Sequence, residues 1–163
     1  MRAQRLRGVS TSVAMALAII AGPLQAQNPK TDLTLGGSTV TFPAPTATDY
    51  VNGYVYSTTG VTYTINATNG ATSHTTTISL RATSANLGGS KPLTDLEWRR
   101  SDLAAWNPIS STNTQVEQKI VVQNLLNDPW NNTIFFRMKL SWTADPPATY
   151  AANYQITLSQ TVP

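Results

Sequence analysis

Residues 132–143, with the sequence NTIFFRMKLSWT, decide the fold class, because every second side chain in this stretch is apolar. The apolar face comprises Ile134, Phe136, Met138, Leu140 and Trp142, and the other face comprises Phe135, Arg137, Lys139 and Ser141. Successive side chains of a β-strand point to opposite faces of a sheet. The stretch therefore predicts a strand with one face in a core and the other face toward solvent.

The last segment, residues 150–158, alternates in the same way. Its apolar face comprises Tyr150, Ala152, Tyr154, Ile156 and Leu158. Residues 145–147, Asp-Pro-Pro, separate it from the first stretch, and proline can continue neither a helix nor a central strand. We therefore predict a hairpin in which these two strands pair side by side.

Further strands are predicted at residues 61–65 and 78–82, which flank an Asn-Gly turn signal at 69–70 and are expected to form a second hairpin. Leu96 and Trp98 mark another strand. Residues 116–126 fit either a strand or a helical pattern, and their β-branched triplet at 120–122 favours a strand. Together the segments predict an all-β fold, a single Ig-like or jelly-roll-type β-sandwich of about seven or eight antiparallel strands.

The first 26 residues have the features of a signal peptide. Three arginines, Arg2, Arg5 and Arg7, precede an uncharged apolar run at 13–24, which is shorter than the roughly 20 residues of a membrane-spanning helix. We predict cleavage after Ala26, which leaves residues 27–163 as one secreted β-sandwich domain without a transmembrane segment. The expected location is extracellular or at the cell surface, reached through the periplasm in a bacterium with two membranes.

Charge and cysteine content exclude several classes of function. The chain has 11 basic and 8 acidic residues, and three of the basic residues lie in the predicted leader, so the mature chain carries 11 − 3 = 8 basic against 8 acidic residues. A near-neutral chain gives no electrostatic basis for binding nucleic acid. The absence of cysteine excludes disulfides, thiol catalysis and cysteine-ligated metal.

The segment at residues 27–42 changes its alternation phase. Leu33 and Leu35 fall at odd positions and Val40 and Phe42 at even positions, with Gly36-Gly37 between them. A bulge, a turn or a change of sheet would produce this shift. The segment is expected to form the first edge strand, or else a semi-independent N-terminal strand extension.

Residues 135–160 combine a strongly alternating strand, an Asp-Pro-Pro loop and the run ATYAANYQITL at 148–158. This pattern resembles the closing hairpin of secreted bacterial Ig-like and fimbrial or spore-coat-U-type domains, although the chain lacks the cysteines of many members. The resemblance implies a surface-exposed or polymerising subunit that inserts an N-terminal strand into a neighbour's sheet. Leu33, Leu35, Val40 and Phe42 would carry that insertion, and the alternative, which we favour, is that they form the domain's own edge strand.

No set of residues predicts catalysis. The only histidine, His74, lies in a Thr-rich stretch that predicts an exposed turn, and no Gly-x-Ser-x-Gly elbow occurs. Asp95 and Glu97 would share one face of a strand at a separation that suits a glycosidase, but Arg99 on that face favours a solvated charged surface. We predict no enzyme activity and no cofactor.

An Asn- and Asp-rich run at residues 124–132, together with Asp145, offers oxygen ligands for calcium. The spacing matches no EF-hand loop, and Asn and Asp are ordinary turn residues. The turn interpretation is therefore preferred, and no metal site is predicted.

Aromatic residues provide the other candidate site. Trp98 and Trp142 fall on predicted apolar faces and are expected in the core. Trp106 and Trp130 fall in predicted loops, and Tyr54 and Tyr56 share a face, so these four are the candidates for a ligand platform.

These observations predict a secreted, non-enzymatic structural or adhesive β-sandwich. Its more specific form is a subunit of a surface or extracellular filament that is assembled by strand addition. The expected partner is another copy or another surface protein. The alternative is a carbohydrate-binding module that presents exposed aromatic rings to polysaccharide.

Overall fold

The computed structural model describes residues 30–36, 40–68, 74–88, 90–121, 130–145 and 150–161. Outside these ranges lie the predicted signal peptide, the Asn-Gly turn signal at 69–70, residues 122–126 of the strand predicted at 116–126, residues 124–129 of the Asn- and Asp-rich run and the two prolines at 146–147.

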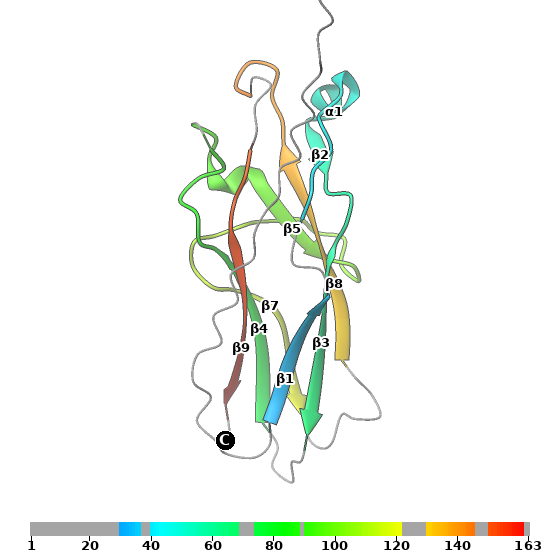
Figure 1. Ribbon diagram of the computed structural model, residues 1–163, viewed down its shortest axis with the longest axis vertical. Helices are drawn as coiled ribbons and strands as arrows, with labels where there is room; N and C mark the ends of the chain where they lie inside the picture. Colours follow the sequence, from blue (N-terminus) through cyan, green and yellow to red (C-terminus); the bar gives the residue numbers. More distant parts are fainter. Residues whose placement is uncertain are drawn as a thin grey trace, which may run out of the picture.

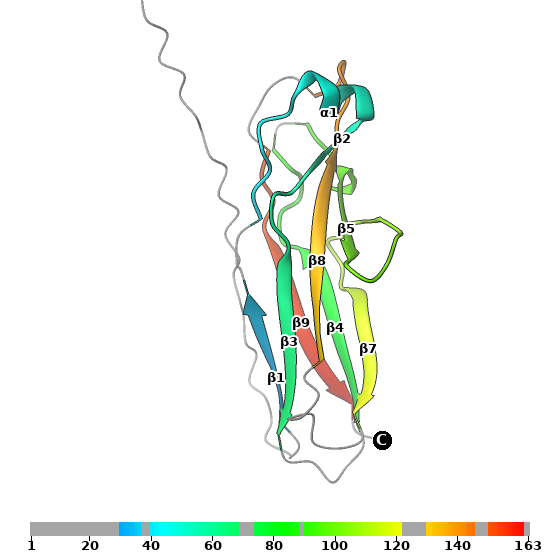
Figure 2. The same ribbon diagram turned by 90° about the vertical axis from the view of Figure 1, so that its right-hand side faces the viewer.

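Two antiparallel sheets form the molecule, which confirms the predicted all-β sandwich (Figure 1). The larger sheet, sheet A, has the strand order β1 (Lys30–Gly36), β3 (Val61–Thr68), β8 (Trp130–Lys139), β5 (Leu96–Arg100) and β6 (Asn107–Pro108), and β2 (Tyr54–Tyr56) also pairs with β8. The smaller sheet, sheet B, has the order β7 (Thr114–Val121), β4 (His74–Ala82) and β9 (Tyr154–Thr161). Figure 2 looks onto sheet A with sheet B behind it, and β1 and β9 lie toward the same side, opposite β7.

Two short helices complete the described elements. The helix α1 (Ala47–Asn52) lies beside β2 at one end of the sandwich (Figure 1). It begins with a capping box, in which Thr46 Oγ1 accepts from the Asp49 backbone N–H at 3.2 Å and Asp49 Oδ2 accepts from the Thr46 backbone N–H at 2.7 Å. It ends at Gly53, whose φ of 79° lies in the left-handed region that glycine tolerates. A 3₁₀ helix, η1 (Leu93–Asp95), precedes β5.

Both predicted hairpins are wrong. β9 pairs with β4 in sheet B, with Leu158 opposite Ile78, and not with β8. β3 and β4 likewise belong to different sheets. Two strands that face each other across a core each show one apolar face, as two neighbours in one sheet do, so alternation alone does not decide between the two arrangements.

The core lies between the sheets and contains the predicted apolar face of β8. Ile134 and Phe136 are almost fully buried, and the ring of Phe136 meets the ring of Tyr154 from β9 at 5.2 Å. Trp98 is also buried, as predicted. The prediction for Trp142 is wrong, because β8 ends at Lys139 and Trp142 is 61% exposed, stacked at 4.5 Å on Tyr50 beside α1.

Candidate functional site

The edges of the two sheets differ in how they are protected against pairing with another chain. Natural proteins protect edge strands by shortness, charge, proline or bulges. β6 has only two residues, one of them Pro108, and β1 carries the exposed Asp32. β7 carries Glu117 and Lys119, and its pairing with β4 is irregular at Ile78. These three edges therefore carry a recognisable protective feature, and so does β2, which pairs only with β8 and has 3 residues.

The remaining described edge, β9, carries none of these features. Its sequence YQITLSQT has no charge, no proline and no glycine over 8 residues. It pairs with β4 along its whole length, from Thr161 opposite Thr75 to Tyr154 opposite Ala82. Within the described residues β4 is its only strand neighbour, so no described strand pairs with the backbone groups on its other side.

The side chains of β9 connect this edge to the core. Tyr154 is fully buried, and Ile156 is 5% exposed. The Tyr154 hydroxyl has no hydrogen-bond partner, and burial raises the pKa of this phenol to about 12. Ser159 and Thr161 are exposed. A strand added to this edge would therefore extend a sheet whose inner face is already fixed by core packing.

The four predicted strand-addition residues separate into two pairs. Leu33 and Leu35 lie in β1, are half-buried, and pair in register with Ile65 and Tyr63 of β3. In the single chain, β1 is therefore the domain's own edge strand. The sequence favoured this arrangement over insertion into a neighbour's sheet.

The second pair is held in the domain. Val40 is 2% exposed and Phe42 packs against the core. Between them, the Thr41 carbonyl accepts hydrogen bonds from the backbone N–H and the hydroxyl of Thr58, at 3.0 and 3.2 Å. Leu33 and Leu35 also pack against the core, but they are only half-buried, so release of β1 would uncover less of the core than release of Val40 would.

Three of the four predicted platform residues meet on the outer face of sheet A. The rings of Tyr56 and Trp106 lie 5.9 Å apart, and the Arg137 guanidinium lies over both Tyr54, at 3.9 Å, and Trp106, at 4.6 Å. The Arg99 guanidinium lies on the same face, 5.1 Å from the ring centroid of Trp106 and 5.7 Å from the ring centroid of Phe135. We call these six residues the arginine–aromatic row.

The row was only partly predictable. Alternation predicted that Tyr54 and Tyr56 share one face and that Phe135 and Arg137 lie on the outer face of β8. It did not predict that Arg99 and Arg137 lie over the aromatic rings. Their guanidinium groups occupy the ring faces that a sugar would need. Tyr56, which is 52% exposed, is the most accessible ring of the predicted set.

Trp130 does not join this row. It is the first residue of β8, not a loop residue, and it is 4% exposed, so its predicted role as an exposed ring is wrong. The Lys119 ammonium lies 5.1 Å from its ring centroid. The Asn- and Asp-rich run before it suggested a loop, but β8 begins at its end.

The predicted acidic pair is split between two ion-pair clusters. Asp95 belongs to η1 and accepts from the buried Lys91 ammonium at 3.0 Å. Glu97 accepts from Arg137 Nε at 2.6 Å and from Lys139 Nζ at 3.0 Å. Its residue exposure is 6%, so the expected solvated face is wrong at this position, because Arg137 and Lys139 of the neighbouring strand β8 extend over it.

The protonation state of Glu97 follows from these contacts. Burial alone would raise its pKa, but the hydrogen bonds from Lys139 and Arg137 outweigh burial and hold the pKa below the ordinary value. Glu97 is therefore ionised at neutral pH, whereas a general acid would need a raised pKa.

His74 is also placed differently from the prediction. It is 2% exposed at the start of β4, not in an exposed turn, and its Nε2 lies 3.4 Å from Gln160 Nε2 of β9. Among the described residues, no three side chains of His, Cys, Asp or Glu are grouped to hold a metal ion. Residues 124–129 of the Asn- and Asp-rich run, for which calcium binding was the less favoured interpretation, lie outside the described residues.

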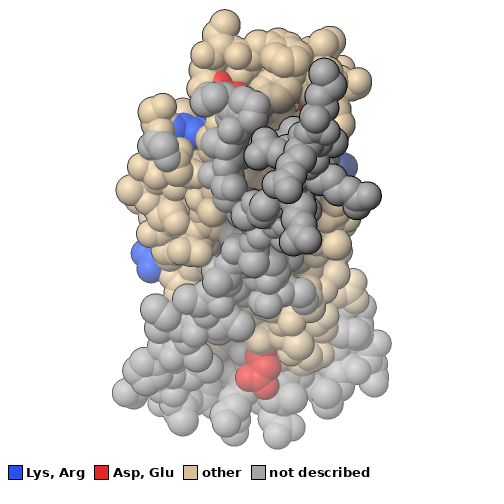
Figure 3. All heavy atoms as spheres, turned by 45° about the horizontal axis from the view of Figure 1, so that its top comes forward, with Lys and Arg blue, Asp and Glu red and all other residues tan. Residues whose placement is uncertain are grey.

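On the face in Figure 3, Lys and Arg atoms and Asp and Glu atoms stand singly among uncharged ones. No helix within the described ranges is long and apolar enough to cross a membrane. The described residues thus form an all-β sandwich in which β9 is the long edge strand without a recognisable protective feature. Comparison with protein-family models gives no match, and the search of curated proteins finds no significant relative.

Proposed function

We propose that the protein is a secreted, non-enzymatic structural module that joins neighbouring proteins by β-strand addition at the β9 edge. The observation that carries this proposal is the eight-residue β9 edge, which lacks the charge, proline, bulge or shortness of the other edges. In strand addition, main-chain hydrogen bonds supply affinity and alternate side chains supply specificity.

The donor that fits this edge best is β1 of another copy. Leu33 and Leu35 occupy alternate positions, so both point to the same side when the strand pairs elsewhere. β1 pairs only with β3 among the described strands, and the Thr41–Thr58 hydrogen bonds hold the following residues in place when β1 leaves. Val40 and Phe42 then remain part of the domain's own core.

Measurement of solution mass tests this proposal. The chain from Gln27 onward is purified, and its mass is measured by light scattering over a wide concentration range, with negative-stain images of the same samples. We expect a concentration-dependent ladder of sizes or filaments, which Ser159→Lys on β9 and deletion of residues 27–36 both abolish. Gln115→Lys, an equally exposed site on the protected edge strand β7 of the same sheet, is the matched control and retains assembly.

A peptide experiment separates donor from acceptor. The protein lacking residues 27–36 is titrated with a labelled peptide of that sequence, and the same titration is made with Ser159→Lys added. Binding that Ser159→Lys abolishes supports addition at β9, whereas binding that it leaves unchanged places the peptide back on β3. A monomer at every concentration that also binds no peptide overturns the proposal.

The alternative function, a carbohydrate-binding module that presents exposed rings, has weaker support. Such a platform needs ring faces open to sugar. In the arginine–aromatic row, Arg137 and Arg99 lie against the faces of Tyr54 and Trp106. The β9 edge therefore supports assembly better than the row supports stacking of a polysaccharide.

A further inference from the structure

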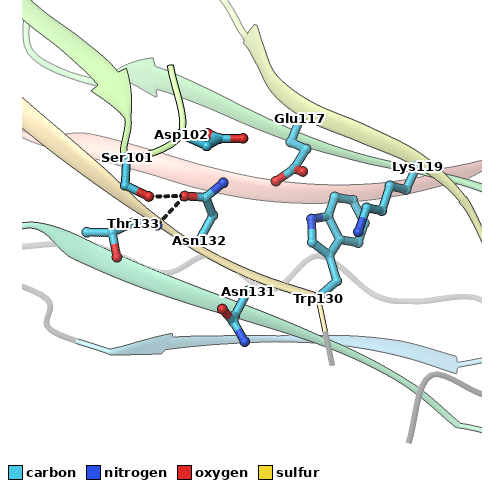
Figure 4. Close-up of a pocket in the computed structure, with 8 residues that line it drawn as sticks. All are labelled: Ser101, Asp102, Glu117, Lys119, Trp130, Asn131, Asn132 and Thr133. Atoms are coloured by element: carbon cyan, nitrogen blue, oxygen red, sulfur yellow. Dashed lines mark hydrogen bonds between the residues drawn. The ribbon is translucent and has the colours of Figure 1, made fainter. Parts of the chain in front are cut away.

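A polar cleft lies where edge strand β7 meets the first residues of β8 (Figure 4). Its volume is about 610 Å³, and its walls come from three elements. Ser101 and Asp102 contribute from the turn after β5, Glu117 and Lys119 contribute from β7, and residues 130–133 contribute from β8. The volume falls within the roughly 300–1,000 Å³ of small-molecule sites.

Trp130 supplies a buried donor with no acceptor. The residue is 4% exposed, and its indole Nε1 has no hydrogen-bond partner. Buried tryptophan N–H groups normally have one. Figure 4 shows the indole nitrogen on the ring edge that faces Glu117 and Asn132. Trp98 also has an unpartnered indole N–H, but it does not line this cleft, so only Trp130 offers its donor to a ligand there.

The charges in and beneath the cleft balance. Arg100 donates from Nε to Asp102 at 2.8 Å and forms a second bond to it through Nη2, and its Nη1 lies 3.5 Å from Glu117. Glu117 also accepts from the Tyr63 hydroxyl. The carboxylates of Asp102 and Glu117 are therefore matched by two cations, Arg100 between them and Lys119 at the rim. Arg100 between the carboxylates opposes a bound cation, and the carboxylates oppose a bound anion.

The positions of the polar groups are fixed by hydrogen bonds. Asn132 Oδ1 accepts from the Ser101 hydroxyl and from the Thr133 backbone N–H, the latter at 2.8 Å. This leaves the Asn132 amide N–H₂ group to donate. The hydrogen bonds from Arg100 lower the pKa of Asp102 to about 2, so that carboxylate is ionised at neutral pH. The cleft therefore presents oriented carboxylate acceptors, an indole donor and an ammonium donor within one small volume.

Sugar hydroxyls match this set, because each donates one hydrogen bond and accepts others. We propose that the cleft binds one unit of a neutral saccharide, with Trp130 Nε1 donating to a sugar oxygen and with Asp102 and Glu117 accepting from sugar hydroxyls. Lys119 lies over the indole ring and closes the rim. The site uses the edge of the tryptophan, not an exposed ring face. It goes beyond the proposed assembly and does not depend on it, since the cleft involves neither β1 nor β9.

Binding to defined oligosaccharides tests the proposal. The secreted chain is titrated with neutral gluco-, manno-, xylo- and galacto-oligosaccharides and with oligouronates as the acidic comparison, and binding is followed by ¹⁵N NMR of the four tryptophan indole N–H signals. The Trp130→Phe variant, which keeps an aromatic ring but has no N–H, identifies the Trp130 signal. We expect a neutral oligosaccharide to shift that signal most.

Two variants and one control locate the site. Trp130→Phe and Asp102→Asn are each expected to weaken binding about tenfold, the effect of losing one well-oriented hydrogen bond. Because Asp102 lies at the surface, Asp102→Asn keeps the test valid if Trp130→Phe disturbs folding. Trp106→Phe in the arginine–aromatic row is the control and should leave affinity unchanged.

Each contrary result rejects the proposal. Failure of every neutral oligosaccharide to bind at millimolar concentration excludes the saccharide site. Preference for oligouronates contradicts the charge balance of the cleft. Binding that depends on Trp106 and not on Trp130 moves the ligand to the outer face of sheet A. Because solution mass is measured separately, loss of assembly and loss of sugar binding are distinguished.

Discussion

The hydroxyl of Tyr63 in β3 donates a hydrogen bond to the Glu117 carboxylate in β7, which joins sheet A to sheet B by a polar contact across the sandwich. Tyr63 is fully buried, and Arg100 of β5 shares Glu117 through an ion pair at 3.5 Å. The same carboxylate lines the polar cleft. The contact therefore links the core, the alignment of the two sheets and the candidate ligand site.

Replacing Tyr63 with phenylalanine should destabilise the protein by about 1–3 kcal/mol, since it removes one buried hydrogen bond and leaves Glu117 with fewer partners. The measurement is urea unfolding followed by tryptophan fluorescence. Tyr56→Phe serves as the control, because Tyr56 is 52% exposed, and it should change the unfolding free energy by less than about 0.5 kcal/mol. Equal losses for both variants would contradict a structural role for the Tyr63–Glu117 contact.

Stability should fall at alkaline pH. Burial first, and the hydrogen bond to Glu117 second, raise the pKa of Tyr63 above its ordinary value, and burial raises the pKa of Tyr154 to about 12. Both phenols stay protonated in the folded chain above pH 10, where the unfolded chain loses their protons. Their contribution is complete below the unfolded pKa and is lost as pH rises, by at most about 1.4 kcal/mol per pH unit for each group.

Tyr154→Phe distinguishes this linkage from general alkaline damage. Its hydroxyl has no hydrogen-bond partner, so at pH 7 the variant should be as stable as the natural chain or more stable. Between pH 10 and 12 the variant should lose stability less steeply with pH. Urea unfolding at several pH values measures both quantities. An unchanged slope would mean that Tyr154 does not contribute to the pH dependence.

The sequence predicted the strand faces well because alternation reports burial directly. Ile134, Phe136 and Met138 point inward along β8 as predicted, β5 contains Leu96 and Trp98 as expected, and β7 covers residues 116–121 of the strand predicted at 116–126. The strand partners were predicted wrongly in both hairpins, because the partner of a strand is set by the path of the connecting loops and not by its own alternation. Trp142 shows a related limit, since the apolar alternation continues past Leu140 while the chain turns away from the sheet.

The candidate sites were harder to predict because they depend on neighbours that only the sheet order reveals. Glu97 is buried by Arg137, which stands opposite it in β8, and nothing near Glu97 in the sequence indicates this. Trp106 joins the arginine–aromatic row because it precedes the short strand β6, which pairs with β5. The cleft at Trp130 likewise needs β7 and β8 to face each other from different sheets.

A close backbone approach at Gly60 gives a further prediction. A Cβ atom at this position would lie 2.4 Å from Thr133 Cγ2 and 3.0 Å from the Ile134 carbonyl oxygen. Gly60→Ala should therefore destabilise the protein by about 1–3 kcal/mol. Adding Thr133→Ser removes the methyl group and should restore part of this loss, but not all, because the carbonyl remains. If the double variant is no more stable than Gly60→Ala, the methyl contact is not the cause.

The buried Lys91 pair gives the last prediction. Lys91 is 4% exposed, and its ammonium contacts Asp145 at 2.7 Å and Asp95 at 3.0 Å. Asp145 also accepts from the Ser141 backbone N–H at 2.8 Å, which helps to hold the turn that follows β8. Lys91→Met leaves Asp145 buried without its cation, and removal of one partner from a buried pair costs about 3–5 kcal/mol.

A lysine at a partly exposed pair provides the comparison for Lys91→Met. Lys139 contacts Glu97 at 3.0 Å, but its side chain is 41% exposed and Glu97 keeps its bond to Arg137. Lys139→Met should therefore cost less than about 1 kcal/mol. Both variants are measured by urea unfolding at pH 7. The burial argument predicts a clearly larger loss for Lys91→Met, and similar losses in the two variants would refute it.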